Sequence, residues 1–195
     1  MLPKEAARRA AFEQLSSAYS ASDRHYHTLQ HVRMLLDTVE HHAANLLDPV
    51  AVQLAVWFHD AVYSYRRSDN EARSAALAQK FLAASTLPVA RQQRVAYLIE
   101  RTKDHTQPFS TPDSDLAFFL DADLQILGTS EADYWQYARQ VRQEYRLIPD
   151  VLYRPGRRKV LEKLLAAPTL YRTPAFQQRL EAPARRNLRL ELADL

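Results

Sequence analysis

The sequence contains no cysteine and only two glycines among its 195 residues. Without cysteine there is no disulfide, no zinc–thiolate site, no cysteine-ligated iron–sulfur cluster and no catalytic thiol. Any metal ion must therefore be held by histidine nitrogen and carboxylate oxygen. Glycine supplies the left-handed positions of hairpins and strand-to-helix turns, so its scarcity argues against β-rich and Rossmann-like folds. Because helix formers such as alanine, leucine and arginine are plentiful, we expect an all-α fold.

Long apolar runs are also missing. No uncharged apolar stretch of about eighteen residues occurs, and the first residues lack the apolar core of a signal peptide. We therefore expect a cytoplasmic protein without a membrane partner. The net charge is +3, and arginines are concentrated in the C-terminal part, where acidic residues are interleaved with them. No ribonucleoprotein motif, zinc finger or helix-turn-helix signature accompanies them, so nucleic acid is not an expected partner.

Apolar spacing and stop signals predict a series of amphipathic helices in one domain over residues 1–195, with a C-terminal helical extension. Gly128 is expected to be a left-handed helix cap, Pro155-Gly156 a turn and Pro183 an interruption of the last helix. The predicted helices span about 4–19, 29–42, 49–60, 69–84, 89–101, 113–127, 131–145 and 158–166, with a last one from 174 onward.

The adjacent residues His59 and Asp60 end the most apolar of these helices. Asp48-Pro49 is a strong helix start, and only Gln53 interrupts the apolar run that follows it. Such a helix is usually central to the core, and an aspartate beside it is costly to bury unless a cation pairs with it. A divalent metal ion would meet that need. The alternative is a hydrogen-bonded aspartate beside a packed histidine.

Two further segments carry candidate ligands. His27 and His31 are four residues apart at the start of a helix that Thr28 is expected to cap, so one could bind metal while the other faces a substrate. Packing at a helix start is the alternative. Asp121 and Asp123 are flanked by apolar residues and diverge by about 200° on a helix, so one is expected to face the site and the other to cap or support it.

Together these residues resemble the HD superfamily of metal-dependent phosphohydrolases, an all-helical fold with the ordered pattern His, then His-Asp, then Asp. The resemblance implies His31, His59 and Asp60 as metal ligands. It favours Asp123 over Asp121 as the last one, because Ala122-Asp123 resembles the Ala-Asp setting of the family. The segment from Tyr26 to His31 also resembles the Tyr-His-Asn-x-x-x-His segment of cyclic-nucleotide phosphodiesterases. That likeness implies His27 as the general acid, with Thr28 in place of asparagine.

Four longer motifs resemble a bacterial group of predicted HD phosphohydrolases. They are Tyr-His-x-x-x-His, Phe-His-Asp-Ala-Val-Tyr, Asp-Asn-Glu-x-x-Ser-Ala and Phe-Leu-Asp-Ala-Asp-Leu-x-Ile-Leu-Gly, at residues 26–31, 58–63, 69–75 and 119–128. The resemblance covers residues 20–165 and is fainter through 185–188. It does not imply a substrate.

Four more residues are candidates for roles around the metal ion. Glu71 could orient the attacking water or favour the start of its helix. His105 follows a helix, where related proteins often place a phosphate-binding or second-metal histidine. Arg142 and Arg157 are candidate phosphate clamps, although most arginines at such positions are surface residues.

The resulting hypothesis is hydrolysis of a small phosphoester, in particular of a nucleotide. His27 would protonate the leaving oxygen, and Asp60 or Glu71 would orient the nucleophile. Mixed nitrogen and oxygen ligation suits manganese, iron, cobalt, nickel or zinc. A catalytically silent nucleotide sensor is one alternative. A di-iron oxygenase of the same fold is another alternative. Such a site needs extra histidines between the His-Asp pair and the last aspartate, and His105 is the only histidine in that interval.

Overall fold

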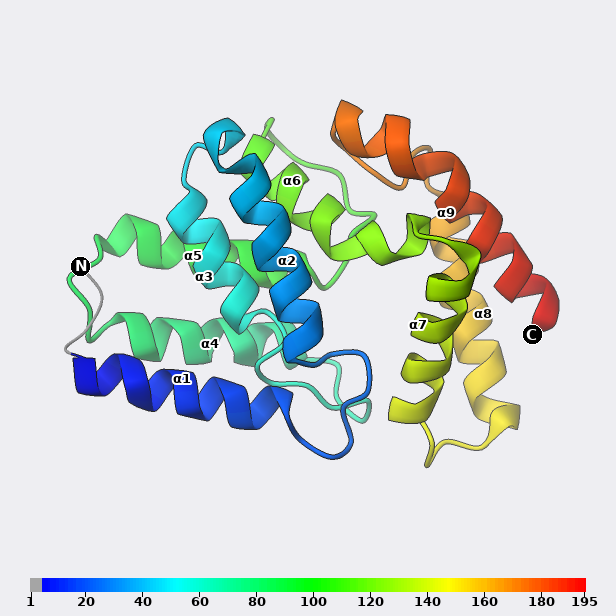
Figure 1. Cartoon of the computed structure of the whole chain (residues 1–195), viewed down its shortest axis with the longest axis horizontal. Coiled ribbons are helices and arrows are strands. Elements are labelled where there is room, and N and C mark those ends of the chain that lie inside the picture. Colours follow the sequence, from blue (N-terminus) through cyan, green and yellow to red (C-terminus); the bar gives the residue numbers. More distant parts are fainter. Residues whose placement is uncertain (1–4) are drawn as a thin grey trace. The chain divides into compact units, whose positions relative to one another are not determined.

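The computed structural model describes the backbone of residues 5–195 and the side chains from Arg8 onward. Within this range the chain forms nine α-helices, two 3-10 segments and no strand, which confirms the predicted all-α fold (Figure 1). None of the described helices is long and apolar enough to cross a membrane. The predicted start of the first helix at Lys4 lies outside the described residues, as does the side chain of Ala7.

The chain divides into two compact units, one ending at His105 and one running from Thr106 to Leu195. The single domain over residues 1–195 stays a prediction. The first unit contains α1 (Glu5–Tyr19), α2 (Leu29–His42), η1 (Ala43–Asn45), α3 (Pro49–Phe58), α4 (Asn70–Leu82) and α5 (Val89–Arg101). In this unit α4 packs against α5, while α3 contacts α2, α4 and α5.

Helix α3 is central to the first unit, as its sequence predicts. The Asp48 side chain accepts a hydrogen bond from the Ala51 N–H at 3.1 Å, and Pro49 occupies the first helical position, where a missing N–H costs nothing. Six of the ten residues of α3 are buried, and the exposed residues Val50 and Gln53 lie on one face of the helix. It ends at Phe58 and leaves His59 at its C-terminal cap.

The second unit contains α6 (Ser114–Asp123), η2 (Leu124–Gly128), α7 (Glu131–Glu144), α8 (Asp150–Ala166) and α9 (Pro174–Asp194). Here η2 packs against α6, α7 and α9, and α8 packs against α9. The predicted cap of α7 is confirmed, because Ser130 Oγ accepts a hydrogen bond from the Asp133 N–H at 3.2 Å. The Asn187 side chain of α9 donates to the carbonyl oxygens of Leu127 and Thr129 at 2.9 and 3.0 Å and so holds the end of η2.

Two predicted breaks are wrong. Pro155 and Gly156 lie inside α8, and Pro183 lies inside α9. A proline within a helix removes one backbone hydrogen bond. In α8 this loss is offset by packing on both sides of the proline, since Tyr153, Arg157 and Leu161 are all buried. Tertiary packing therefore decides the course of the chain here, against local propensity.

The predicted left-handed cap at Gly128 is also wrong, since no glycine in the described residues has a positive φ. The close approach of η2 to α9 explains the glycine instead. A Cβ at position 128 would lie 2.6 Å from Leu180 Cβ and 2.9 Å from the Leu180 carbonyl oxygen. Neither atom belongs to the flexible end of a side chain, so only glycine fits without a shift of α9.

Candidate metal centre

His59 is held in a defined orientation at the end of α3. It is only 1% exposed, and its Nδ1 lies 2.9 Å from the Val56 carbonyl oxygen. A carbonyl oxygen only accepts, so Nδ1 must be the protonated nitrogen of the ring. In the neutral imidazole Nε2 then carries a lone pair. A backbone hydrogen bond at one nitrogen and a lone pair at the other is the usual arrangement of a metal-binding histidine.

Three side chains direct donor atoms toward one point, and we call them the metal triad: His31, His59 and Asp60. The Nε2 atoms of the two histidines are 3.3 Å apart. Asp60 Oδ2 lies 3.0 Å from His59 Nε2 and 3.8 Å from His31 Nε2. Two ligands about 2.1 Å from one ion and about 90–110° apart lie about 3.0–3.4 Å from each other. Two of the three separations, 3.0 and 3.3 Å, fall in this range and the third, 3.8 Å, is wider, so the triad could hold a single metal ion with one larger ligand–metal–ligand angle.

The electrostatics of the triad also call for a cation. His31 and His59 are buried, and the Asp60 side chain is 20% exposed. A carboxylate oxygen that faces an imidazole lone pair is repelled unless positive charge lies between them. That charge is either a metal ion or a proton on one of the rings. The buried His-His-Asp group could hold a metal ion, in agreement with the sequence prediction for these three residues.

His27 lies beside the triad, in the loop before α2. It is half-buried, and its ring centroid is 6.1 Å from that of His31. The ring of Tyr63 stacks on it with a 4.3 Å separation of centroids, and Tyr26 contacts it edge-on at 5.1 Å. Aromatic contacts on two sides restrict the orientation of the imidazole. His27 is thus near the metal triad but outside it, where a general acid would lie; that role stays a prediction.

Arg24 is a residue of this region that the sequence did not single out. It is half-buried, and its guanidinium donates to three backbone carbonyl oxygens: those of His27, Asp60 and Ala61. Arginines that act through backbone carbonyls leave no pattern of spacing or composition, which explains the omission.

Asn70 and Ser74 belong to the motif at residues 69–75, but the sequence alone assigns them no role. The side chain of Asn70 accepts from the Ser64 N–H and donates to the Ser64 carbonyl, at 3.1 and 3.0 Å. Ser74 Oγ does the same for the backbone of Val62, at 3.0 and 3.2 Å. Two side chains of α4 therefore fix the segment that follows the His59-Asp60 turn.

The carboxylate of Asp121 is held by three hydrogen bonds from residues of the second unit. It is 1% exposed and accepts hydrogen bonds from the Arg172 N–H, the Thr173 N–H and Thr173 Oγ1, each at 2.7 Å. Burial raises the pKa of its carboxyl, and the bonds from Thr173 and Arg172 act in the opposite direction. Thr173 is the N-cap residue of α9, so Asp121 fixes the start of that helix.

Asp123 is the last residue of α6 and is half-buried. Its role as fourth ligand stays a prediction that rests on the family resemblance, and Asp121, with its carboxylate occupied by three donors, is the weaker alternative.

Glu71 and His105 lie outside the metal triad. Glu71 occupies the first turn of α4 and is half-buried, an arrangement that suits a helix N-terminus. His105 follows α5 and is also half-buried. Neither is among the residues whose donor atoms converge, so their predicted roles toward water and phosphate stay predictions.

The two candidate phosphate clamps have carboxylate partners within the second unit. Arg157 donates from Nε and Nη2 to Glu191 at 2.7 and 2.8 Å, and their side chains are 8% and 6% exposed. Tyr134 also donates to Glu191. Arg142 bonds Asp150 at 2.6 Å and stacks over the Tyr153 ring at 4.5 Å. These contacts give both arginines structural roles, and a phosphate contact stays a prediction.

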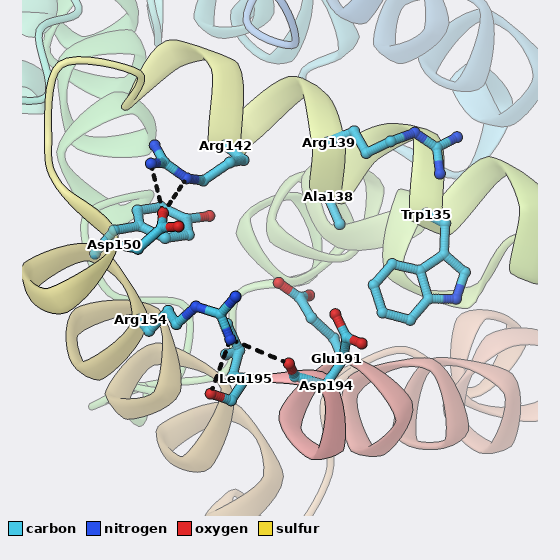
Figure 2. Close-up of a pocket in the computed structure, with 10 residues that line it drawn as sticks. Trp135, Ala138, Arg139, Arg142, Asp150, Arg154, Glu191, Asp194 and Leu195 are labelled. Carbon is cyan, nitrogen blue, oxygen red and sulfur yellow. Dashed lines mark hydrogen bonds and ion pairs between the residues drawn. The ribbon is translucent and has the colours of Figure 1, made fainter.

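A pocket of about 250 Å³ opens between α7, α8 and α9 of the second unit (Figure 2). Arg142 and Asp150 bond each other on one side of it, and Arg154 contacts the carbonyl oxygens of Asp194 and Leu195 on another. Glu191, which lines the pocket, is neutralised by Arg157. Acidic and basic groups therefore offset one another around this pocket, which gives it no clear preference for an anion.

Comparison with protein-family models, with curated proteins and with solved structures gave no match for this chain. The features that point to a function are therefore the metal triad, the residues around it and the resemblance of the sequence motifs.

Proposed function

We propose that the protein is a metal-dependent phosphohydrolase that acts on a nucleotide or another small phosphoester. The observation that carries the proposal is the convergence of two imidazole nitrogens and one carboxylate oxygen, 3.0–3.8 Å apart, at the end of a buried helix. Two imidazole nitrogens and a carboxylate oxygen this close together need positive charge between them, and a metal ion supplies it for all three at once. The order of these residues in the sequence agrees with that of the HD superfamily.

The ligand set fits a divalent transition metal. Imidazole and carboxylate together suit manganese, iron, cobalt, nickel or zinc better than calcium, which prefers oxygen ligands. A bound ion of this kind supplies Lewis-acid charge that polarises a phosphoryl oxygen and activates water. Asp123 is the proposed fourth ligand.

The residues around the triad have separate roles in the proposal. Asp60 or Glu71 accepts a hydrogen bond from the attacking water and orients it toward phosphorus. His27, beside the triad and in partial contact with solvent, donates a proton to the leaving oxygen. His105 is the proposed contact to the phosphate.

Elemental analysis of the purified full chain, coupled to a panel of phosphomonoesters and phosphodiesters, tests the proposal. The wild type is expected to contain about one or more equivalents of a transition metal and to hydrolyse at least one ester. Asp60→Ala should lose both metal and activity. Asp37→Ala removes an exposed carboxylate of α2 and should lose neither. A wild type that holds no metal after reconstitution with manganese, cobalt or zinc contradicts the proposal.

The same samples distinguish the two alternatives. Retained metal and saturable nucleotide binding without turnover would identify a sensor. Oxygen consumption by the iron-loaded protein would identify an oxygenase. Either result replaces phosphoester hydrolysis as the function but leaves the metal triad in place.

A further inference from the structure

We propose that Arg24 is a positioning residue that holds the His27 loop against the His59-Asp60 turn and so sets both the metal triad and the candidate general acid. This inference rests on the proposed function. Its first support is the distribution of hydrogen bonds from one guanidinium. Nη1 donates to the His27 carbonyl at 3.2 Å and to the Asp60 carbonyl at 2.6 Å, and Nη2 donates to the Ala61 carbonyl at 3.1 Å.

The partners of Arg24 come from two segments. His27 lies three residues further along the same loop before α2, whereas Asp60 and Ala61 lie in the turn after α3, 36 and 37 residues away. An arginine is suited to this position because its planar fork presents several donors in a fixed geometry, whereas a lysine ammonium presents a single point charge.

Aromatic rings hold the guanidinium itself in place. Its Cζ lies 5.0 Å from the centroid of the Tyr19 ring and 5.5 Å from that of Tyr63. Tyr19 is buried and donates to the Trp57 carbonyl at 3.1 Å, which ties it to the last turn of α3. Tyr63 stacks on the His27 ring. Arg24 is therefore linked to His27 in two ways, directly through the His27 carbonyl oxygen and indirectly through the Tyr63 ring that both residues contact.

Metal affinity provides a test that needs no turnover. Titration of the full metal-free chain with Co²⁺, followed by calorimetry, should show about 10- to 100-fold weaker binding for Arg24→Gln than for the wild type, the usual effect of losing a residue that orients ligands. Coulomb's law alone predicts the reverse, because removal of a positive charge near a cation site strengthens binding. The sign of the change therefore separates positioning from electrostatics.

Arg33→Gln is the matched control. It removes the same charge from α2, the helix that carries His31, at a position whose side chain is 84% exposed. Co²⁺ affinity should stay within about twofold of the wild type, since surface changes away from a site have small effects. Arg24→Lys keeps the charge but loses the fork, and we expect it to bind Co²⁺ between the wild type and Arg24→Gln. If Arg24→Gln fails to fold, as judged by circular dichroism, Arg24→Lys carries the test.

The choice of leaving group tests the effect on His27. A 4-nitrophenyl ester needs little proton donation to its leaving oxygen, whereas an alkyl ester needs much more. At saturating metal, Arg24→Lys and His27→Ala should both lower kcat more for the alkyl ester than for the 4-nitrophenyl ester. A merely structural role of Arg24 would lower both rates by the same factor.

The outcomes separate the two proposals. Unchanged or tighter Co²⁺ binding by folded Arg24→Gln overturns the positioning role and leaves the proposed function standing. A wild type that binds none of Mn²⁺, Co²⁺ and Zn²⁺ overturns the proposed function and, with it, this inference. Weaker binding by Arg24→Gln with normal binding by Arg33→Gln supports the positioning role, whether or not any ester is hydrolysed.

Discussion

Three carboxylates of the chain, two in the second unit and one in the first, face different kinds of atoms. In the second unit the buried acids Asp121 and Glu191 meet donors: Asp121 accepts from two backbone N–H groups and a hydroxyl, and Glu191 accepts from Arg157 and Tyr134. In the first unit Asp60 is directed at the Nε2 atoms of two histidines. Burial alone is thus a poor indicator of function. The chemistry of the facing atoms distinguishes a structural acid from a candidate metal ligand.

The largest effect is expected from the Arg157–Glu191 pair. Arg157→Met leaves Glu191 buried without its cation and should lower the free energy of unfolding by about 3–5 kcal/mol. Urea denaturation measures the loss. The double variant Arg157→Met/Glu191→Met should regain most of it, because two apolar side chains of similar size replace the pair. If the single variant is as stable as the wild type, Arg157 does not stabilise the buried carboxylate of Glu191.

A smaller effect, confined to metal-containing samples, is expected for the triad. A metal ion that binds only the folded protein stabilises it by about 2.7 kcal/mol at a free concentration of 100 times Kd. Thermal and urea denaturation of the wild type with and without Mn²⁺ should show this gain, and Asp60→Ala should show none. Arg157→Met should keep the gain despite its lower stability. If Mn²⁺ stabilises the wild type and Asp60→Ala equally, Asp60 is not a metal ligand and does not differ from the structural acids of the second unit.

The smallest effect is expected at the aspartates of α6, where a structural acid, Asp121, and a proposed metal ligand, Asp123, are only two residues apart. Asp121→Asn places an amide opposite three donors and should cost about 1–3 kcal/mol, without loss of metal. Asp123→Asn should lower the metal content with little change in the stability of the metal-free protein. The reverse result, with metal lost from Asp121→Asn alone, would identify Asp121 as the ligand. Its hydrogen bonds to the start of α9 would then not be its main function.

Several features of the fold and the site could be predicted because they depend on neighbouring residues. The start of α3 follows from Asp48-Pro49, and the cap of α7 follows from Ser130 and Asp133. His59-Asp60 was also singled out, since an acid at the end of an apolar helix is conspicuous in sequence, whereas His31, 28 residues earlier, was assigned from the family resemblance. These are local signals, and packing does not override them.

Other features could not be predicted because distant residues determine them. Gly128 is required by the approach of Leu180, and Pro155 lies within a helix because the residues around it are buried. The partners of Asp121 are 51 and 52 residues away in the sequence. Arg24 acts on carbonyl oxygens, which every residue has, so nothing in the sequence marks its partners.

The short sequence separation of the triad has a consequence for biosynthesis. His31 and His59 are separated by 28 residues, and Asp60 follows directly. Closing so short a loop costs little chain entropy, and low contact order favours rapid folding. During synthesis at about 5–20 residues per second, all three ligands are made several seconds before α9 is complete. The nascent chain thus carries the whole group that could hold a metal ion before α9 is made, so the synthesis of that group does not depend on the last helix.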